Sequence, residues 1–69
     1  MPALRTYQAQ LSLPASIARV RAAVGAIERV GGRVEFLPTT TSGVLTVRLH
    51  LPPAYAPEVF LPGLPFYPV

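Results

Sequence analysis

Residues 6–34 read TYQAQLSLPASIARVRAAVGAIERVGGRV, and this stretch decides the fold because its hydrophobic period changes along it. From Thr6 to Leu13 apolar and polar side chains alternate, which is typical of a half-buried strand. Pro14 interrupts the alternation, and apolar residues then recur at spacings of three and four, as in a helix that turns one face to a core. They are Ile17, Val20, Val24, Ile27 and Val30. The chain therefore opens with a strand followed by an amphipathic helix.

Signals for the ends of the helix flank this apolar stripe. We expect Ser16 to be the N-cap, because its hydroxyl can accept a hydrogen bond from a free backbone N–H of the first turn. We expect Gly31-Gly32 to end the helix, since glycine adopts a left-handed conformation without a steric penalty. Gly25, inside the helix, indicates either close packing against a neighbour or simple tolerance.

Two more strands follow the helix. Residues 33–37 alternate with Val34 and Phe36 inward and end at Pro38, and residues 44–51 alternate again. Residues 39–43, TTTSG, form the predicted turn of an antiparallel hairpin. Because a crossover through a helix is right-handed, the last strand fills the gap between the first two. We predict an α+β fold, the β-α-β-β half of a ferredoxin-like sandwich, with one helix on a three-stranded sheet.

The sheet face away from the helix is predicted to be polar and exposed. It carries Thr6, Gln8, Gln10, Arg33, Glu35, Thr46, Arg48 and His50. The outer edge of the first strand is expected to be unpaired, which favours association with another chain.

Residues 51–69 hold six of the nine prolines and four of the six aromatic residues. A stretch so rich in proline is neither an ordinary helix nor a central strand, and it is too apolar for a solvated tail. We therefore divide the chain into a β-α-β-β domain over residues 1–52 and a proline-rich apolar tail over residues 53–69. The tail packs either on its own core or on a partner subunit, with room for one helical turn around residues 54–55 or 58–60.

Composition limits the classes of protein that the chain can represent. With 51% hydrophobic and 13% charged residues in only 69, it is apolar for its size, which favours a homodimer. The absence of cysteine excludes disulfides and thiolate metal sites. The first residues carry neither a secretory leader nor a membrane span, so we expect a soluble, cytoplasmic protein with no membrane contact. The six arginines are scattered along the chain, whereas nucleic-acid binders usually cluster their cations.

No catalytic or metal-binding constellation is recognisable, so we expect neither an enzyme nor a cofactor. His50 is the one histidine and has no acid/base partner nearby in sequence, which is typical of a surface residue. Glu35 is interpreted as a cross-strand ion-pair partner of Arg48. The serines lie in strand-end, cap and turn contexts without a base, so no serine nucleophile is predicted.

Three segments together resemble an ACT domain of the acetolactate synthase small-subunit kind: residues 13–20 (LPASIARV), 26–34 (AIERVGGRV) and 43–51 (GVLTVRLHL). The similarity covers residues 5–52. It implies a ferredoxin-like regulatory module that dimerises through its sheet edge or its helices and binds a small effector such as an amino acid at the interface. By this resemblance the effector site is lined by Leu13, Ala15 and Ser16.

We therefore expect a small non-catalytic regulatory or interaction module, ACT-like and homodimeric, with a protein partner or a small-molecule effector. Two alternatives stay open. One is a basic nucleic-acid-binding protein that uses the exposed sheet face, although the predicted residues of that face include no aromatic ring on which bases could stack. The other is a structural subunit that docks on its partner through the apolar tail.

Overall fold

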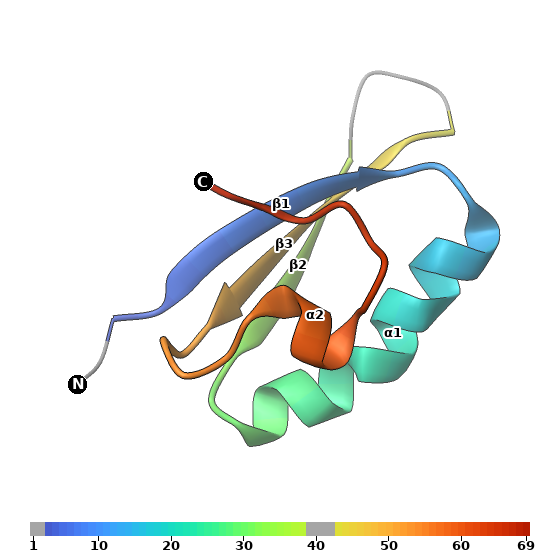
Figure 1. The fold of residues 1–69 in the computed structure, drawn as a ribbon. Helices are drawn as coiled ribbons and strands as arrows, with labels where there is room; N and C mark the ends of the chain where they lie inside the picture. Colours follow the sequence, from blue (N-terminus) through green and yellow to red (C-terminus); the bar gives the residue numbers. More distant parts are fainter. Residues whose placement is uncertain (1–2, 39–42) are drawn as a thin grey trace.

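A four-stranded antiparallel sheet, covered on one face by a long helix, organises the chain in the computed structural model, which describes residues 3–38 and 43–69 (Figure 1). The strands are β1 (Arg5–Leu11), β2 (Arg33–Pro38), β3 (Leu45–Leu51) and β4 (Tyr67–Pro68). The helices are α1 (Pro14–Arg29) and the single turn α2 (Pro57–Phe60). The strand order is β2-β3-β1-β4, and each neighbouring pair is antiparallel. Neither helix combines the length and hydropathy needed to cross a bilayer, within the part of the chain that is described.

The core forms where the apolar faces of the sheet and of α1 meet. The register pairs Ala9 with Val47 and Tyr7 with Leu49, so the inward positions of β1 and β3 lie side by side under the helix. The fully or almost fully buried core residues are Ala9, Leu11, Val20, Ile27, Val47, Leu49, Leu51 and Leu61. Val20 and Ile27 come from the predicted helical stripe, while its other members are half-buried. The sequence period therefore identified the packing face of α1.

Phe36 lies on the core side of β2, opposite Val47, as the alternation predicts. The residue is nevertheless 39% exposed, because β2 is an outermost strand of the sheet. The guanidinium of Arg21 lies 5.7 Å from the centre of the ring, within the range of a cation–π contact.

The two ends of α1 follow different rules. The prediction of Ser16 as N-cap is wrong: the helix begins at Pro14, and Leu13 occupies the cap position without a side-chain hydrogen bond. Proline suits the first helical position because its backbone nitrogen has no proton that needs a partner. The C-terminal prediction is confirmed. Gly31 has φ of +87°, and the N–H groups of Gly31 and Gly32 donate to Glu28 O (3.0 Å) and Ile27 O (2.9 Å), as in a Schellman motif.

Gly25 occupies open space, since a Cβ built there would meet no atom within 4 Å. Its presence in α1 is therefore a matter of tolerance rather than of close packing. The predicted turn at residues 39–43 lies outside the described residues except for Gly43, which has φ of +78°.

The prediction of a three-stranded sheet with an unpaired first strand is wrong, because the chain returns to that edge as β4. Tyr7 pairs with Pro68 and Gln8 with Tyr67, and the N–H of Val69 donates to Thr6 O at 3.0 Å. Proline is tolerated in this position because β4 is an edge strand whose outer side needs no donor. The proline-rich segment therefore supplies a short fourth strand.

Residues 53–69 also contribute to the core beneath α1. Leu61 is 2% exposed and belongs to the core cluster, and several aromatic and aliphatic side chains of the same segment pack around it. They are Tyr55, Phe60, Leu64 and Phe66. The rings of Tyr55 and Phe60 lie 5.7 Å apart between centroids, at an angle of 43°. The turn α2 and residues 61–66 thus lie on the same face of the sheet as α1 (Figure 1).

Candidate functional site

The polar face of the sheet carries the densest set of side-chain interactions in the described residues. Strand register places Thr6, His50 and Arg33 in one row across β1, β3 and β2. Gln8, Arg48 and Glu35 form the next row, and Gln10, Thr46 and Leu37 the third. All eight residues predicted for this face lie on it. The prediction that they are solvated is only partly right, because Thr46 is buried and only Gln10 and Arg33 are fully exposed, while the other five are half-buried. We call this surface the open face.

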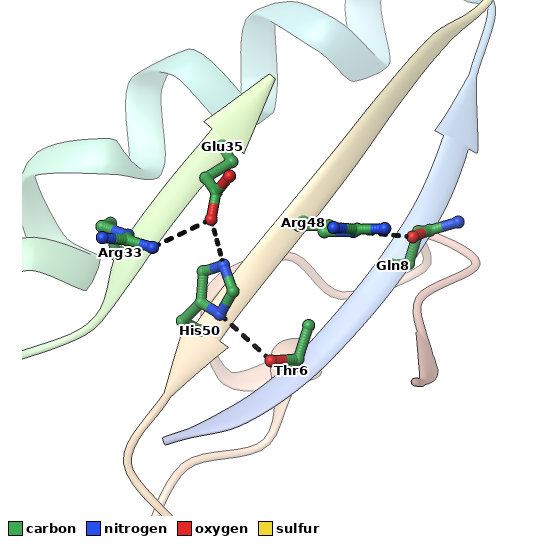
Figure 2. Close-up of polar contacts among 6 residues, drawn as sticks. All are labelled: Thr6, Gln8, Arg33, Glu35, Arg48 and His50. Carbon is green, nitrogen blue, oxygen red and sulfur yellow. Dashed lines mark hydrogen bonds and ion pairs between the residues drawn. The ribbon is translucent and has the colours of Figure 1, made fainter. Parts of the chain in front are cut away.

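His50 links two neighbouring strands through its imidazole ring (Figure 2). Its Nε2 lies 2.6 Å from Glu35 Oε1 on β2, and its Nδ1 lies 3.1 Å from Thr6 Oγ1 on β1. Arg33 Nη2 donates to the same Glu35 Oε1 at 3.0 Å. Sequence reasoning placed these side chains on one face but found no partner for His50, because the partners come from strands distant in sequence.

The ionisation of Glu35 fixes the hydrogen-bond directions in this group. The hydrogen bond from His50, followed by that from Arg33, holds the pKa of the Glu35 carboxyl below its usual 4.5, although partial burial acts in the opposite direction. An ionised carboxylate only accepts, so the His50 Nε2–H donates to it. In a neutral ring Nδ1 then accepts from the Thr6 hydroxyl. The carboxylate therefore selects one tautomer of His50.

A carboxylate, an imidazole and a hydroxyl in a row are the side chains of a catalytic triad. A working triad also needs groups that stabilise the charge on the reacting oxygen. Thr6 lies within β1, whose backbone pairs with β3 on one side and with β4 on the other. Its neighbouring backbone groups are thus engaged in the sheet, whereas acyl transfer needs donors directed at a developing oxyanion. We interpret the group as a device that orders the open face, and the absence of enzymatic activity stays a prediction.

A second chain of hydrogen bonds crosses the middle row of the open face. Arg48 Nε donates to Gln8 Oε1 at 2.9 Å, and Gln8 Nε2 donates to the hydroxyl of Tyr67 at 3.2 Å. The predicted ion pair between Glu35 and Arg48 is wrong, although the two residues are register partners. Glu35 instead interacts with Arg33 and His50, while Arg48 turns toward β1 (Figure 2).

The three residues predicted to bind an effector lie at the start of α1. Leu13 is 65% exposed, Ala15 is exposed and Ser16 is half-buried. The helix that they begin packs on the core face, so the predicted effector site and the open face are separate surfaces. No hydrogen bond from the Ser16 side chain caps the helix.

Two hollows formed by described residues lie elsewhere, and the three predicted residues line neither. The first has a volume of about 390 Å³, lies between α1 and α2, and is lined by Arg19, Ala22, Ala23, Ala26, Val59, Phe60 and Leu61. Arg19 Nη2 also donates to Pro62 O at 2.6 Å. The second, of about 430 Å³, is lined by Leu4, Arg5, Thr6, Tyr7, Pro68 and Val69. Sequence reasoning missed both because each depends on where residues 57–69 return to the domain.

Comparison with known proteins finds no family model, no curated protein and no solved structure that matches the chain.

Proposed function

We propose that the chain is a small, non-catalytic regulatory or interaction module, ACT-like and ferredoxin-like, that works as a homodimer and binds a small effector such as an amino acid. The observation that carries the proposal is the outer edge of β2. This strand ends the sheet and pairs with no other described strand on its outer side. An open strand edge is a template for pairing with another chain.

The composition of β2 suits a second copy of the same strand. Phe36 is 39% exposed at this edge, and a partner strand would cover part of it. The one proline of β2, Pro38, lies at its end and does not interrupt the edge.

The topology supports a ferredoxin-like module. β1, α1 and β2 form a crossover unit, β3 lies between the two strands, and β4 returns to the far side of β1. In this interpretation α2 is the second helix of the fold, reduced to one turn by the prolines around it. An edge-to-edge dimer would join two four-stranded sheets through their β2 strands and leave both open faces accessible.

The effector part of the proposal rests on the ACT resemblance and on the exposure of Leu13. Leu13 is 65% exposed at the start of α1, so a bound molecule that covered its apolar side chain would gain binding free energy from the buried area. Ala15 and Ser16 lie in the adjacent first turn of α1 and would contact the same molecule. Leu13, Ala15 and Ser16 are therefore the proposed effector-binding residues.

Thermal unfolding in the presence of each amino acid tests the proposed function. A ligand at about 100 times its dissociation constant adds roughly 2.7 kcal/mol of stability. In a domain of this size that raises Tm by about 10–20 °C. We expect such a shift with at least one amino acid.

Leu13→Asp is expected to abolish the shift while leaving the unliganded Tm almost unchanged. Val59→Asp is the matched control, because Val59 is 62% exposed and lies on α2. It should retain the shift. A Tm that no amino acid moves would contradict effector binding, and a shift that survives in Leu13→Asp would contradict the proposed site.

A further inference from the structure

The open face has no covering element among the described residues. Both helices pack on the opposite face, and residues 61–66 follow them there (Figure 1). Two chains of hydrogen bonds nevertheless connect six of its eight predicted side chains across the strands. A hydrogen-bonded polar surface that no described element covers is suited to binding a partner.

Charge on the open face is unevenly compensated. Among the described residues of this face, Glu35 is the one carboxylate, and it already interacts with Arg33 and His50. Arg48 makes a single side-chain hydrogen bond among the described residues, from Nε to Gln8. Its two terminal amino groups are therefore available to a ligand. The whole chain carries a net charge of +3, so an anionic partner is favoured.

Tyr67 supplies the aromatic ring that the sequence did not predict for this face. It pairs with Gln8 across β1 and β4, and its hydroxyl accepts a hydrogen bond from the Gln8 side chain. Tyr67 is 48% exposed. Because neighbouring strands are about 4.8 Å apart, Tyr67 on β4 and Arg48 on β3 have backbones separated by about 10 Å. Gln8 holds both groups on the same row.

From this arrangement we infer that the open face binds single-stranded nucleic acid, with a phosphate on the Arg48 guanidinium and a base stacked on Tyr67. Arginine presents parallel donors that match two phosphate oxygens. Every base can stack on an aromatic side chain, so stacking does not depend on the nucleotide sequence. This suits a face with few base-specific groups. An acidic polypeptide would use Arg48 but not the ring, so the combination favours a nucleic acid. The inference goes beyond the proposed dimer and effector site and uses different residues.

Binding is measured by fluorescence anisotropy with labelled oligouridylate RNA and oligothymidylate DNA of about 12 nucleotides, a length within the range that one small domain covers. Wild-type protein is expected to bind the single strands in preference to a duplex of the same length. If the protein binds both oligomers, contacts to phosphate and base are sufficient for binding. If it binds only the RNA, a contact to the 2′-hydroxyl is also needed. Either result supports the inference.

Variants separate the phosphate contact from the stacking contact. Arg48→Ala is expected to reduce the slope of log affinity against log salt by about 0.7, the contribution of one phosphate on a single strand. Tyr67→Leu is expected to weaken binding by roughly 5- to 150-fold without changing that slope. Tyr67→Phe keeps the ring and should bind almost as tightly as wild type. Circular dichroism checks the fold of each variant, and Arg48→Gln replaces Arg48→Ala if the latter is unfolded.

Arg29→Ala is the matched control for charge. Arg29 is exposed in the last turn of α1, on the other side of the sheet, and its removal lowers the net charge by the same amount. It should leave the affinity almost unchanged. Equal losses in Arg29→Ala and Arg48→Ala would overturn the inference, because net charge alone would then explain binding. Equal binding of duplex, full competition by polyglutamate, or no loss in Tyr67→Leu would also overturn it.

Discussion

Truncation of Leu61 to alanine tests whether residues 53–69 are part of the core. Leu61 is 2% exposed and lies among residues of β1, β3 and α1, although it follows α2 near the end of the chain. If the segment only rested on the surface, shortening this side chain would change stability little. If the segment completes the core, Leu61→Ala removes buried methyl groups and leaves a cavity.

The magnitude follows from the burial of Leu61. Buried leucine-to-alanine changes cost about 2–5 kcal/mol, the transfer and cavity contributions together. At about 0.05–0.15 kcal/mol per residue, a chain of 69 residues has a free energy of unfolding of roughly 3–10 kcal/mol. The substitution is therefore expected to remove a large share of the total, and the variant will be partly unfolded if the wild-type value lies at the low end.

Urea unfolding followed by circular dichroism measures this loss as a lower midpoint at an unchanged m-value. Val59→Ala is the control, because Val59 belongs to the neighbouring turn α2 but is 62% exposed. Its cost should stay within about 0.5 kcal/mol. Equal and small costs for the two variants would refute the conclusion that residues 53–69 complete the core.

Three further predictions concern the glycines of the helix and its C-terminus, and the Glu35 group. Gly25→Ala should raise the free energy of unfolding by about 1 kcal/mol, since alanine is the better helix former and its Cβ meets open space; a lower Tm would contradict this. Gly32→Ala should lower the free energy of unfolding by roughly 1–3 kcal/mol, because the added Cβ would lie 2.7 Å from His50 O and 2.8 Å from Ile27 Cγ2. An unchanged urea-unfolding midpoint would contradict this close approach. The pKa of Glu35 is lowered by folding, so the ionised carboxylate stabilises the protein above its usual pKa of 4.5 and loses that effect as the pH falls through the folded value. The stability of wild type relative to Glu35→Gln should therefore decrease between about pH 7 and pH 3, and a constant difference would show that Glu35 is not held in this way.

Local patterns predicted β1, α1 and β3, because each carries a period that only one secondary structure can place in a core. The alternation around Leu11 and Leu49 and the spacing from Val20 to Ile27 are such periods. The start of α1 was misplaced because two signals compete there. Proline at the first helical position is pre-organised for the helix, and Pro14 prevailed over the capping hydroxyl of Ser16.

The path of residues 53–69 could not be predicted from local sequence. Their prolines disfavour a long helix or a central strand but do not indicate which surface the segment covers. The pairing of Tyr67 with Gln8 joins residues far apart in the chain, and no period in the sequence encodes such a contact. Both hollows and the aromatic ring of the open face depend on that return.

The open face was predicted as a surface but not as a network. Alternation along each strand identified its members, since side chains two residues apart share a face. Bonding between them depends on which neighbouring strand a long side chain reaches. Glu35 reaches His50 on the adjacent row, and Arg48 reaches Gln8 on the other side of β3. Register alone would have paired Glu35 with Arg48.

Sedimentation velocity over a range of protein concentrations tests the proposed β2-edge homodimer most directly. We predict a dimer for the wild type and a monomer for Phe36→Lys, which would place a charge at the strand edge. Val59→Lys, which adds the same charge at an exposed apolar position on α2, should remain dimeric. A wild-type chain that stays monomeric, or a Phe36→Lys variant that dimerises as wild type does, would contradict association through β2.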